Sequence, residues 1–187
     1  MQDRLRELAR ALRYREHRED FVHEWRRRWT GSPHLPRGPI RRVAVICHGN
    51  ICRSQFAGAF LARTREDLEV RSAGLAARAG SPSDPGALRA ARHYGLDLRA
   101  HEARPLESDD VEWADLILGM QGRHREEVER RWPGSGAKVR LLGDFLPEPP
   151  FAIADPWGES DAVFEETFER IAAAVDALSA RLPVSRG

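Results

Sequence analysis

The amino-acid sequence predicts an α/β fold: a four-stranded parallel, doubly wound sheet with helices on both faces, preceded by an N-terminal helical extension. Short β-branched apolar segments alternate along the chain with longer segments of helical period, and strands that alternate with helices form parallel sheets. The first such segment, residues 43–46, is apolar throughout, which is typical of a strand buried on both faces. In such sheets ligands bind beyond the carboxyl ends of the strands.

The N-terminal part of the chain, residues 2–30, is expected to be helical, as one long helix or two shorter ones separated by the polar residues 15–20. Apolar residues recur in it at helical spacing: Leu5, Leu8 and Leu12, then Phe21, Val22, Trp25 and Trp29.

Two interpretations of this helix are open. We expect its apolar stripe to pack on the domain while its arginines stay in water. The alternative is an arm that binds a partner, a second copy or a membrane surface, with Arg26-Arg27-Arg28 as its electrostatic contact. Three histidines, His17, His23 and His34, lack metal-ligand spacing, and we expect them on the surface.

The compact domain is expected to begin near Ile40, after a linker rich in glycine and proline. We therefore divide the chain into a helical extension with its linker, residues 1–39, and one α/β domain, residues 40–187. The expected strands are 43–46, 68–74, 114–118 and 139–142. The expected helices of the domain are 54–67, 84–94, 121–131 and 161–182, and a long proline-rich loop, 146–158, precedes the last of them.

Composition limits the class of protein. A chain of 187 residues suits one domain with a substantial core. It has no apolar run near the roughly 20 residues that span a bilayer, so we expect no integral membrane segment, and no secretory signal. Its two cysteines, Cys47 and Cys52, lie five residues apart without zinc-site spacing, and we expect a reducing cytoplasm.

The charge is unevenly distributed. Residues 1–42 hold 12 arginines against 6 acidic residues, so this arm carries +6 and the remainder of the chain −5. An acidic body argues against nucleic-acid binding by the domain itself.

The chemistry of the chain is concentrated where the first expected strand ends. Cys47 closes the strand, a loop with Gly49 and Asn50 follows, and Arg53 and Ser54 open the next helix. A strand that turns into a helix N-terminus forms an anion site of backbone N–H groups. Thiols are more readily ionised at helix N-termini and beside cations, and an arginine fork suits two oxygens of a phosphate. These residues indicate a thiolate nucleophile aimed at a bound oxyanion.

Two alternatives compete with this interpretation of the loop. Cys47 and Cys52 could be small buried hydrophobes beside a tight turn, although the complete string Cys-x-Gly-Asn-x-Cys-Arg-Ser is far more specific than an isolated cysteine and arginine. A nucleotide-binding phosphate loop is disfavoured, because no Gly-Lys-Ser/Thr closes the segment.

Residues 43–57 resemble the active-site loop of the low-molecular-weight protein tyrosine phosphatases. Further similarities follow in the order of that family: Ser-Ala-Gly at 72–74, the segment 97–104, the strand at 115–120, and Asp-Pro at 155–156. The resemblance covers about residues 40–182 and leaves residues 1–39 outside it.

The resemblance implies a two-step displacement on aryl phosphate monoesters. Cys47 would attack phosphorus, Arg53 would hold the equatorial oxygens, and Asp155 would act as general acid and then base. It implies no metal and no cofactor, since the guanidinium and the loop amides supply the charge stabilisation. The implied substrate-binding residues are His48, Gly49, Asn50, Ile51, Cys52, Ser54 and Trp157.

Departures from the family pattern keep alternatives open. Gln55 replaces the usual proline and is more typical of the related arsenate reductases, so the alternative function is an arsenate reductase. Such an enzyme would use a small-molecule thiol, because no cysteine follows Cys52 to serve a cascade of three cysteines. His48 occupies the variable loop position that faces the substrate. Cys52 would form a reversible disulfide with Cys47 by resemblance, or be a loop-packing thiol. Trp157 would be a wall beside a phosphotyrosine ring, or a packed loop aromatic.

The leading hypothesis is therefore a phosphatase acting on phosphotyrosine-containing proteins, a bacterial tyrosine kinase among them by analogy. A phosphoprotein-binding module on an inactive scaffold would predict the loss of Cys47, Arg53 or Asp155, and all three are present.

Overall fold

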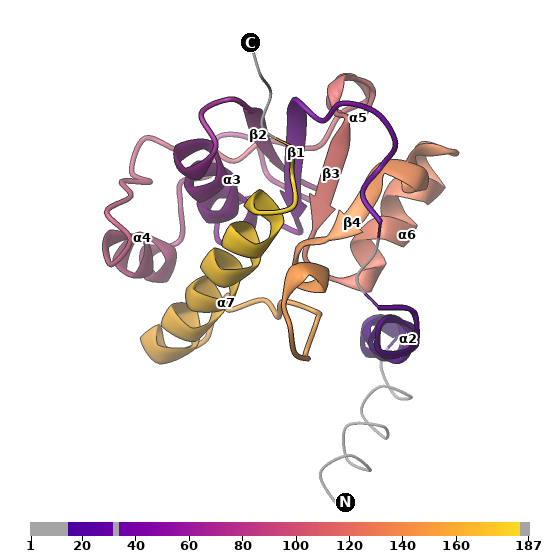
Figure 1. Ribbon diagram of the computed structural model, residues 1–187. Helices are drawn as coiled ribbons and strands as arrows, with labels where there is room; N and C mark the ends of the chain where they lie inside the picture. Colours follow the sequence, from indigo (N-terminus) through magenta and orange to yellow (C-terminus); the bar gives the residue numbers. More distant parts are fainter. Residues whose placement is uncertain (1–14, 32–33, 184–187) are drawn as a thin grey trace, which may run out of the picture.

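A single parallel sheet forms the centre of the molecule in the computed structural model, which describes residues 15–31 and 34–183. Its strands are β1 (Arg42–Cys47), β2 (Glu69–Gly74), β3 (Leu116–Gly119) and β4 (Val139–Leu141). They lie in the order β2-β1-β3-β4 and are all parallel, as Figure 1 shows. The predicted fold class is confirmed.

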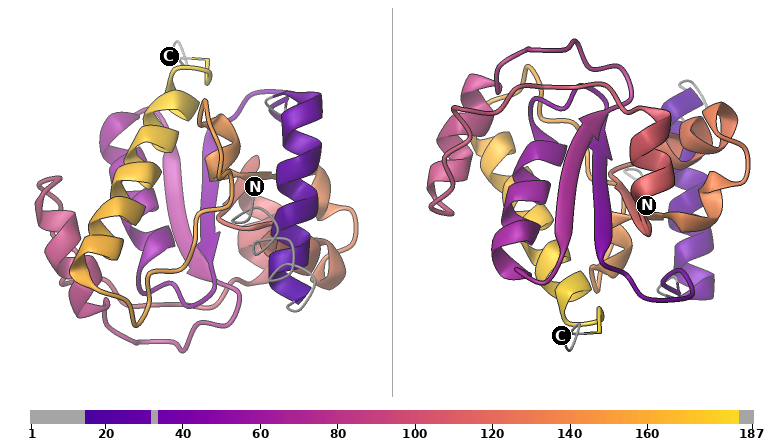
Figure 2. Two further views of the ribbon diagram at one scale, coloured as in Figure 1. Left: turned by 90° about the horizontal axis from the view of Figure 1, so that it is seen from below. Right: turned by 90° about the horizontal axis from the view of Figure 1, so that it is seen from above.

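Helices cover both faces of the sheet (Figure 2). Alternate residues of β1 point to opposite faces: Val43 and Val45 enter one core, and Ala44 and Ile46 enter the other. The first core is covered by α3 (Arg53–Thr64), α4 (Pro85–Arg92) and α7 (Asp161–Ser179), and the second by α5 (Ser108–Trp113) and α6 (Gly122–Arg131).

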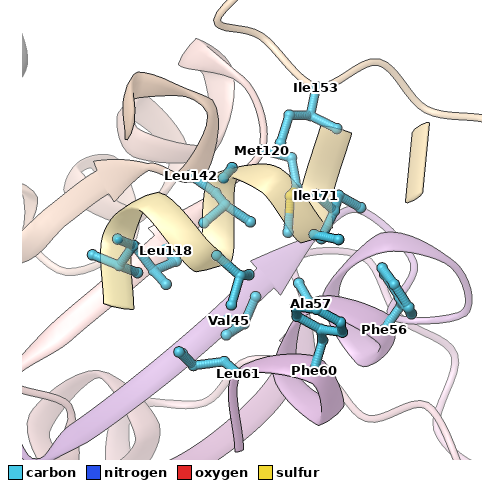
Figure 3. Close-up of a cluster of buried hydrophobic side chains, with 14 of the residues drawn as sticks. Val45, Phe56, Ala57, Phe60, Leu61, Leu118, Met120, Leu142, Ile153 and Ile171 are labelled. Carbon is cyan, nitrogen blue, oxygen red and sulfur yellow. The ribbon is translucent and has the colours of Figure 1, made fainter. Parts of the chain in front are cut away.

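The larger core is organised around aromatic rings between α3 and α7 (Figure 3). The rings of Phe56 and Phe168 stack with centroids 4.0 Å apart and an interplanar angle of 15°, and neither is exposed. Met120 and Ile153 extend this core towards the carboxyl end of β3. The core therefore continues up to the edge of the sheet at which the site is expected.

Three short elements were not predicted: α5 and the two 3-10 helices, η1 (Ser135–Lys138) and η2 (Leu142–Phe145). Each has four to six residues, too few for an apolar period to be recognised. A capping box between Glu107 and Asp110 begins α5. The other elements of the domain match the predicted ones with ends displaced by at most three residues.

The N-terminal helix α2 (Arg15–Thr30) packs beside α6 (Figure 1), and its orientation corrects the prediction for the apolar stripe. Trp25 is 59% exposed and Trp29 77% exposed, and Phe21 and Val22 are also exposed. The prediction that these four residues pack on the domain is wrong. Leu5, Leu8 and Leu12 lie outside the described residues.

Polar residues of α2 face the domain instead, because the surface that they meet presents free N–H groups, a carboxylate and a carbonyl. His23 is half-buried and its Nε2 lies 2.5 Å from Asp144 Oδ1, so its predicted surface position is wrong. His34 is exposed as predicted, and the side chain of His17 lies outside the described part of the chain.

The helices within residues 15–31 and 34–183 include none that combines the length and the apolar character needed to cross a membrane.

The stacked pair in the larger core gives a stability prediction. Phe168→Ala should lower the free energy of unfolding by about 3–5 kcal/mol, the usual cost of removing a buried phenylalanine ring. Urea denaturation followed by circular dichroism measures the change. Phe21→Ala is the matched control, since the ring of Phe21 is exposed on α2. Equal losses in the two variants would contradict the packing described here.

Candidate active site

The loop that joins β1 to α3 lies at the switch point of the sheet. From β1 the chain moves outward to β2 and later crosses back to β3 on the other side of β1. The crevice beyond the carboxyl end of the strand at which the direction reverses is the usual ligand site of such folds. Cys47 ends β1 and Arg53 begins α3, so the predicted loop occupies this crevice.

The backbone of this loop turns its carbonyl groups outward. The carbonyls of Cys47, His48 and Ile51 accept hydrogen bonds from the N–H groups of Leu75, Ala76 and Asp84, each at 2.9 Å. The carbonyl of Asn50 lies 2.7 Å from His101 Nε2. In a trans peptide the following N–H points opposite to the carbonyl. The N–H groups of residues 48, 49, 51 and 52 therefore point towards the centre of the loop, as an anion site requires.

Asn50 holds the loop in this form. Its φ of 56° is left-handed, which asparagine tolerates better than most residues. Its buried side chain donates to Ser54 Oγ at 2.9 Å and to Ser72 Oγ at 3.1 Å, and accepts from the N–H of Arg104 at 3.0 Å. Asn50 is thus a structural centre of the loop.

Gly74 allows β2 to approach the loop closely. A Cβ at this position would lie 2.7 Å from the carbonyl oxygen of His48 and 2.9 Å from the backbone nitrogen of Asn50. Such contacts are shorter than backbone atoms accept, so this part of β2 requires glycine.

The sulfur of Cys47 is buried within the loop. Its Sγ lies 3.1 Å from Ser54 Oγ and accepts the N–H of Asn50 at 3.3 Å. A hydroxyl and a backbone N–H both stabilise a sulfur that carries negative charge. These contacts suit a sulfur that alternates between nucleophile and leaving group.

The guanidinium of Arg53 joins the loop to the opposite side of the crevice. Its side chain has no exposed surface. Nη1 donates to Gln121 Oε1 at 2.9 Å and to the carbonyl of Ile153 at 3.0 Å, and Nη2 forms an ion pair with Asp155. The buried Nε has no hydrogen-bond partner among the described residues.

Asp155 comes from the long loop between η2 and α7, which crosses the ends of the strands. The N–H of Ile153 donates to the carbonyl of Met120 at 2.8 Å, which fixes this loop to the end of β3. The Asp155 side chain is 34% exposed, so one side faces Arg53 and the other faces water. Asp155, which follows Arg53 by 102 residues in the sequence, thus meets the loop of Cys47 and Arg53 at one edge of the sheet.

Comparison with known proteins identifies the family. A model of the low molecular weight phosphotyrosine protein phosphatases matches residues 42–186. The chain belongs to this family. EpsP of Ralstonia nicotianae, a probable low molecular weight protein-tyrosine-phosphatase, is 39% identical over 143 residues, which are 76% of this chain and 97% of EpsP. The resemblance seen in the sequence is thereby confirmed.

A solved structure and a second kind of phosphatase are also similar. The crystal structure of the tyrosine phosphatase AmsI from Erwinia amylovora matches with a TM-score of 0.75 and 31% identity, over 82% of this chain and 99% of AmsI. A protein-arginine-phosphatase of Geobacillus stearothermophilus is 30% identical over 142 residues, 75% of this chain and 95% of that protein. The family match leaves residues 1–41 outside it.

The remaining predicted residues of this phosphatase differ in how deeply they are buried in the loop. His48 is exposed at its rim, Gly49 and Ile51 are half-buried, and Cys52 is buried at the start of α3. Burial raises the pKa of the Cys52 thiol, so Cys52 stays protonated. Both cysteines are free thiols.

Gln55 is fixed at the back of the loop by two hydrogen bonds. Its side chain accepts from Ser83 Oγ at 2.6 Å and donates to the carbonyl of Ile51.

Trp157 lies two residues after Asp155, and 66% of it is exposed. Its backbone N–H donates to Asp155 Oδ1 at 3.4 Å. The alternative that Trp157 is a packed loop aromatic is therefore wrong, and its indole is free to contact a ligand.

Three residues of the site were missed from the sequence: Gln121, His124 and Ile153. His124 is 1% exposed, and its Nδ1 accepts the N–H of Met120 at 3.0 Å. The carbonyl of Met120 in turn holds Ile153. Gln121 and His124 lie three and six residues after a predicted strand, where the switch-point rule could have singled them out. The carbonyl of Ile153 gives no sequence signal.

Replacing Asn50 separates its backbone role from its side-chain role. Asn50→Ala should lower kcat/KM for p-nitrophenyl phosphate about tenfold or more, because a left-handed position is strained and Ser54 and Ser72 lose a buried partner. Asn50→Gly removes the same hydrogen bonds but relaxes the backbone, so it should recover only part of the activity. A glycine variant with wild-type activity would show that the side-chain bonds contribute nothing.

Buried His124 predicts a dependence of stability on pH. Burial, with a smaller contribution from Arg53, holds the pKa of His124 well below 6.5. The unfolded chain therefore binds the proton first, and stability present above pH 6.5 is lost as the pH falls towards the lower folded pKa. His124→Asn retains an acceptor for Met120 and cannot titrate. Between pH 6.5 and 5 the free energy of unfolding of the wild type should fall by up to about 1.4 kcal/mol per pH unit more than that of this variant. Urea denaturation at each pH measures both values. Parallel pH dependences of the two proteins would contradict a low pKa for His124.

Proposed function

We propose that this phosphatase hydrolyses phosphotyrosine in proteins through a phosphocysteine intermediate. The observation that carries the proposal is the position of the Arg53 guanidinium. Arg53 follows the loop that begins at Cys47, and its guanidinium contacts the loop that carries Asp155. An oxyanion bound by the loop amides would lie between the sulfur and the carboxyl group. Family membership supports the reaction class.

In the first step the sulfur of Cys47 attacks phosphorus, the bond between phosphorus and the phenolic oxygen breaks, and Asp155 gives its proton to the leaving oxygen. In the second step Asp155 takes a proton from water, the water oxygen attacks phosphorus, and the sulfur leaves. Ser54 stabilises the departing sulfur. Arg53 and the inward N–H groups hold the three equatorial oxygens in both steps.

The substrate is proposed to be an aryl phosphate because general-acid help matters for a phenolate and because Trp157 presents an exposed ring beside Asp155. EpsP and AmsI are named as tyrosine phosphatases. His48 at the rim would contact the substrate near the leaving group. By analogy with tyrosine phosphatases of bacteria, a tyrosine kinase is one proposed protein substrate, and the cytoplasm is the proposed compartment.

We further propose that residues 40–187 form the catalytic domain and that residues 1–39 are a separate extension. The buried Ile40 and the start of the family match at residue 42 support this boundary.

Hydrolysis of p-nitrophenyl phosphate tests the mechanism. Cys47→Ser should abolish activity almost completely, and Asp155→Ala should lower kcat by about 10²–10⁴-fold, the usual effect of losing a general acid. Asp97→Ala, at an exposed carboxylate on another loop, is the control and should match wild type. An Asp155→Ala enzyme as fast as wild type would remove Asp155 from the mechanism.

The same preparations identify the substrate class. A phosphotyrosine peptide should be turned over faster than a phosphoarginine peptide, and arsenate with a thiol reductant should not be reduced. Preference for phosphoarginine would move the chain towards the activity named for its Geobacillus relative. Reduction of arsenate without hydrolysis of either peptide would favour the arsenate reductase alternative.

A further inference from the structure

We propose that α2, which the family match does not include, is a positioning element of the active site: Glu24 holds the loop that carries Asp155, and Asp20 orients Gln121 against Arg53. This inference rests on the proposed role of Asp155 as general acid. It assigns a task to the polar face of a helix whose apolar residues face away from the domain.

Glu24 binds two consecutive backbone N–H groups of the loop that carries Asp155. Its Oε1 accepts from the N–H of Phe151 and from that of Ala152, the latter at 3.2 Å. The next residue, Ile153, is fixed through its N–H to Met120 and through its carbonyl to Arg53. Three consecutive residues are therefore anchored just before Asp155, and α2 supplies the first two anchors.

Two further residues fix α2 itself in place. The Cζ atom of Arg27 lies 4.5 Å from the centroid of the Phe151 ring, and Nη2 of Arg27 donates to the carbonyl of Asp144 at 2.7 Å. His23 contacts the carboxylate of the same aspartate. Glu24 is thus held by its own helix on one side and by the loop on the other, as a preorganised support requires.

Asp20 acts on the guanidinium through a glutamine. Its Oδ2 accepts Gln121 Nε2 at 3.1 Å and its Oδ1 accepts the N–H of Gly122 at 2.8 Å. With its nitrogen directed to Asp20, Gln121 presents its oxygen to Arg53. A reversed amide would place two N–H donors against the guanidinium, which has no acceptor.

The two contacts predict different kinetic effects. Displacing Asp155 should matter most when the leaving group is a strong base, because phenolate, with a conjugate acid of pKa near 10 as for tyrosine, needs a proton. The p-nitrophenolate ion is a weaker base, so its departure depends less on the proton than the departure of phenolate does. Disturbing Arg53 should weaken the binding of every phosphate ester alike.

The test compares phenyl phosphate with p-nitrophenyl phosphate in the full-length enzyme. Glu24→Ala should lower kcat/KM, which reports the step in which the leaving group departs, about tenfold for phenyl phosphate and less than about threefold for p-nitrophenyl phosphate, a partial loss of general-acid catalysis. Glu24→Gln keeps an acceptor oxygen for the two N–H groups and should restore most of the activity. Arg28→Ala, exposed on the same helix, is the control for an alteration of α2.

Asp20→Asn tests the second contact. It should lower kcat/KM for both substrates about equally, on the order of tenfold, and weaken inhibition by inorganic phosphate to a similar extent. A loss confined to phenyl phosphate would contradict action through Arg53.

Asp155→Ala is measured in parallel to separate the two proposals. In one outcome Asp155→Ala increases the dependence of the rate on the leaving group, while Glu24→Ala lowers the rates for phenyl phosphate and p-nitrophenyl phosphate equally or changes neither. That result overturns the positioning role of Glu24 and leaves the proposed function standing. If Asp155→Ala shows no such dependence, the proposed general acid fails and the role of Glu24 fails with it. Circular dichroism at the assay temperature verifies that each variant is folded, and unfolding of Glu24→Ala would leave Glu24→Gln and Asp20→Asn to decide.

Discussion

A guanidinium without any exposed surface is the interaction on which the rest of the site depends. Removing a charge from water costs much free energy unless hydrogen-bond partners replace the water. Arg53 obtains these partners from Gln121, from the carbonyl of Ile153 and from Asp155. They come from the end of β3 and from the loop before α7, so burying one side chain brings together segments 68 to 102 residues away from it in the sequence.

The loop around Cys47 is held from behind. Its inward N–H groups repel one another, and outward hydrogen bonds through its carbonyls and through Asn50 keep them convergent. Arg104, which donates its N–H to Asn50, is itself fixed by two hydrogen bonds to Asp110. Burial alone would raise the pKa of Asp110, but Arg104, the N–H of Glu107 and Arg71 together outweigh it and lower that pKa. The back of the loop is therefore a satisfied polar network, which favours rigidity.

The helix α2 shows how a polar interface can attach an extension to an active site. Hydrogen bonds have strict geometry, so a helix attached through them has one orientation, whereas a purely apolar contact tolerates sliding. This attachment leaves Trp25 and Trp29 in water. The extension thus leaves its apolar side chains exposed, while its polar side chains make fixed contacts with Gln121 and with the loop that carries Asp155.

The sequence by itself determined the fold class and the anion loop, because alternating strands and helices and the string from Cys47 to Ser54 are local patterns. Asp155 could be chosen only through the resemblance, since one carboxylate in a proline-rich loop carries no local signal. Tertiary structure alone decided that Gln121 and Ile153 contact Arg53 and that α2 turns its polar face inward. The physical reason is that periodicity identifies the apolar side of a helix but not the surface it will meet, and here that surface consists of free N–H groups and the Asp144 carboxylate and carbonyl.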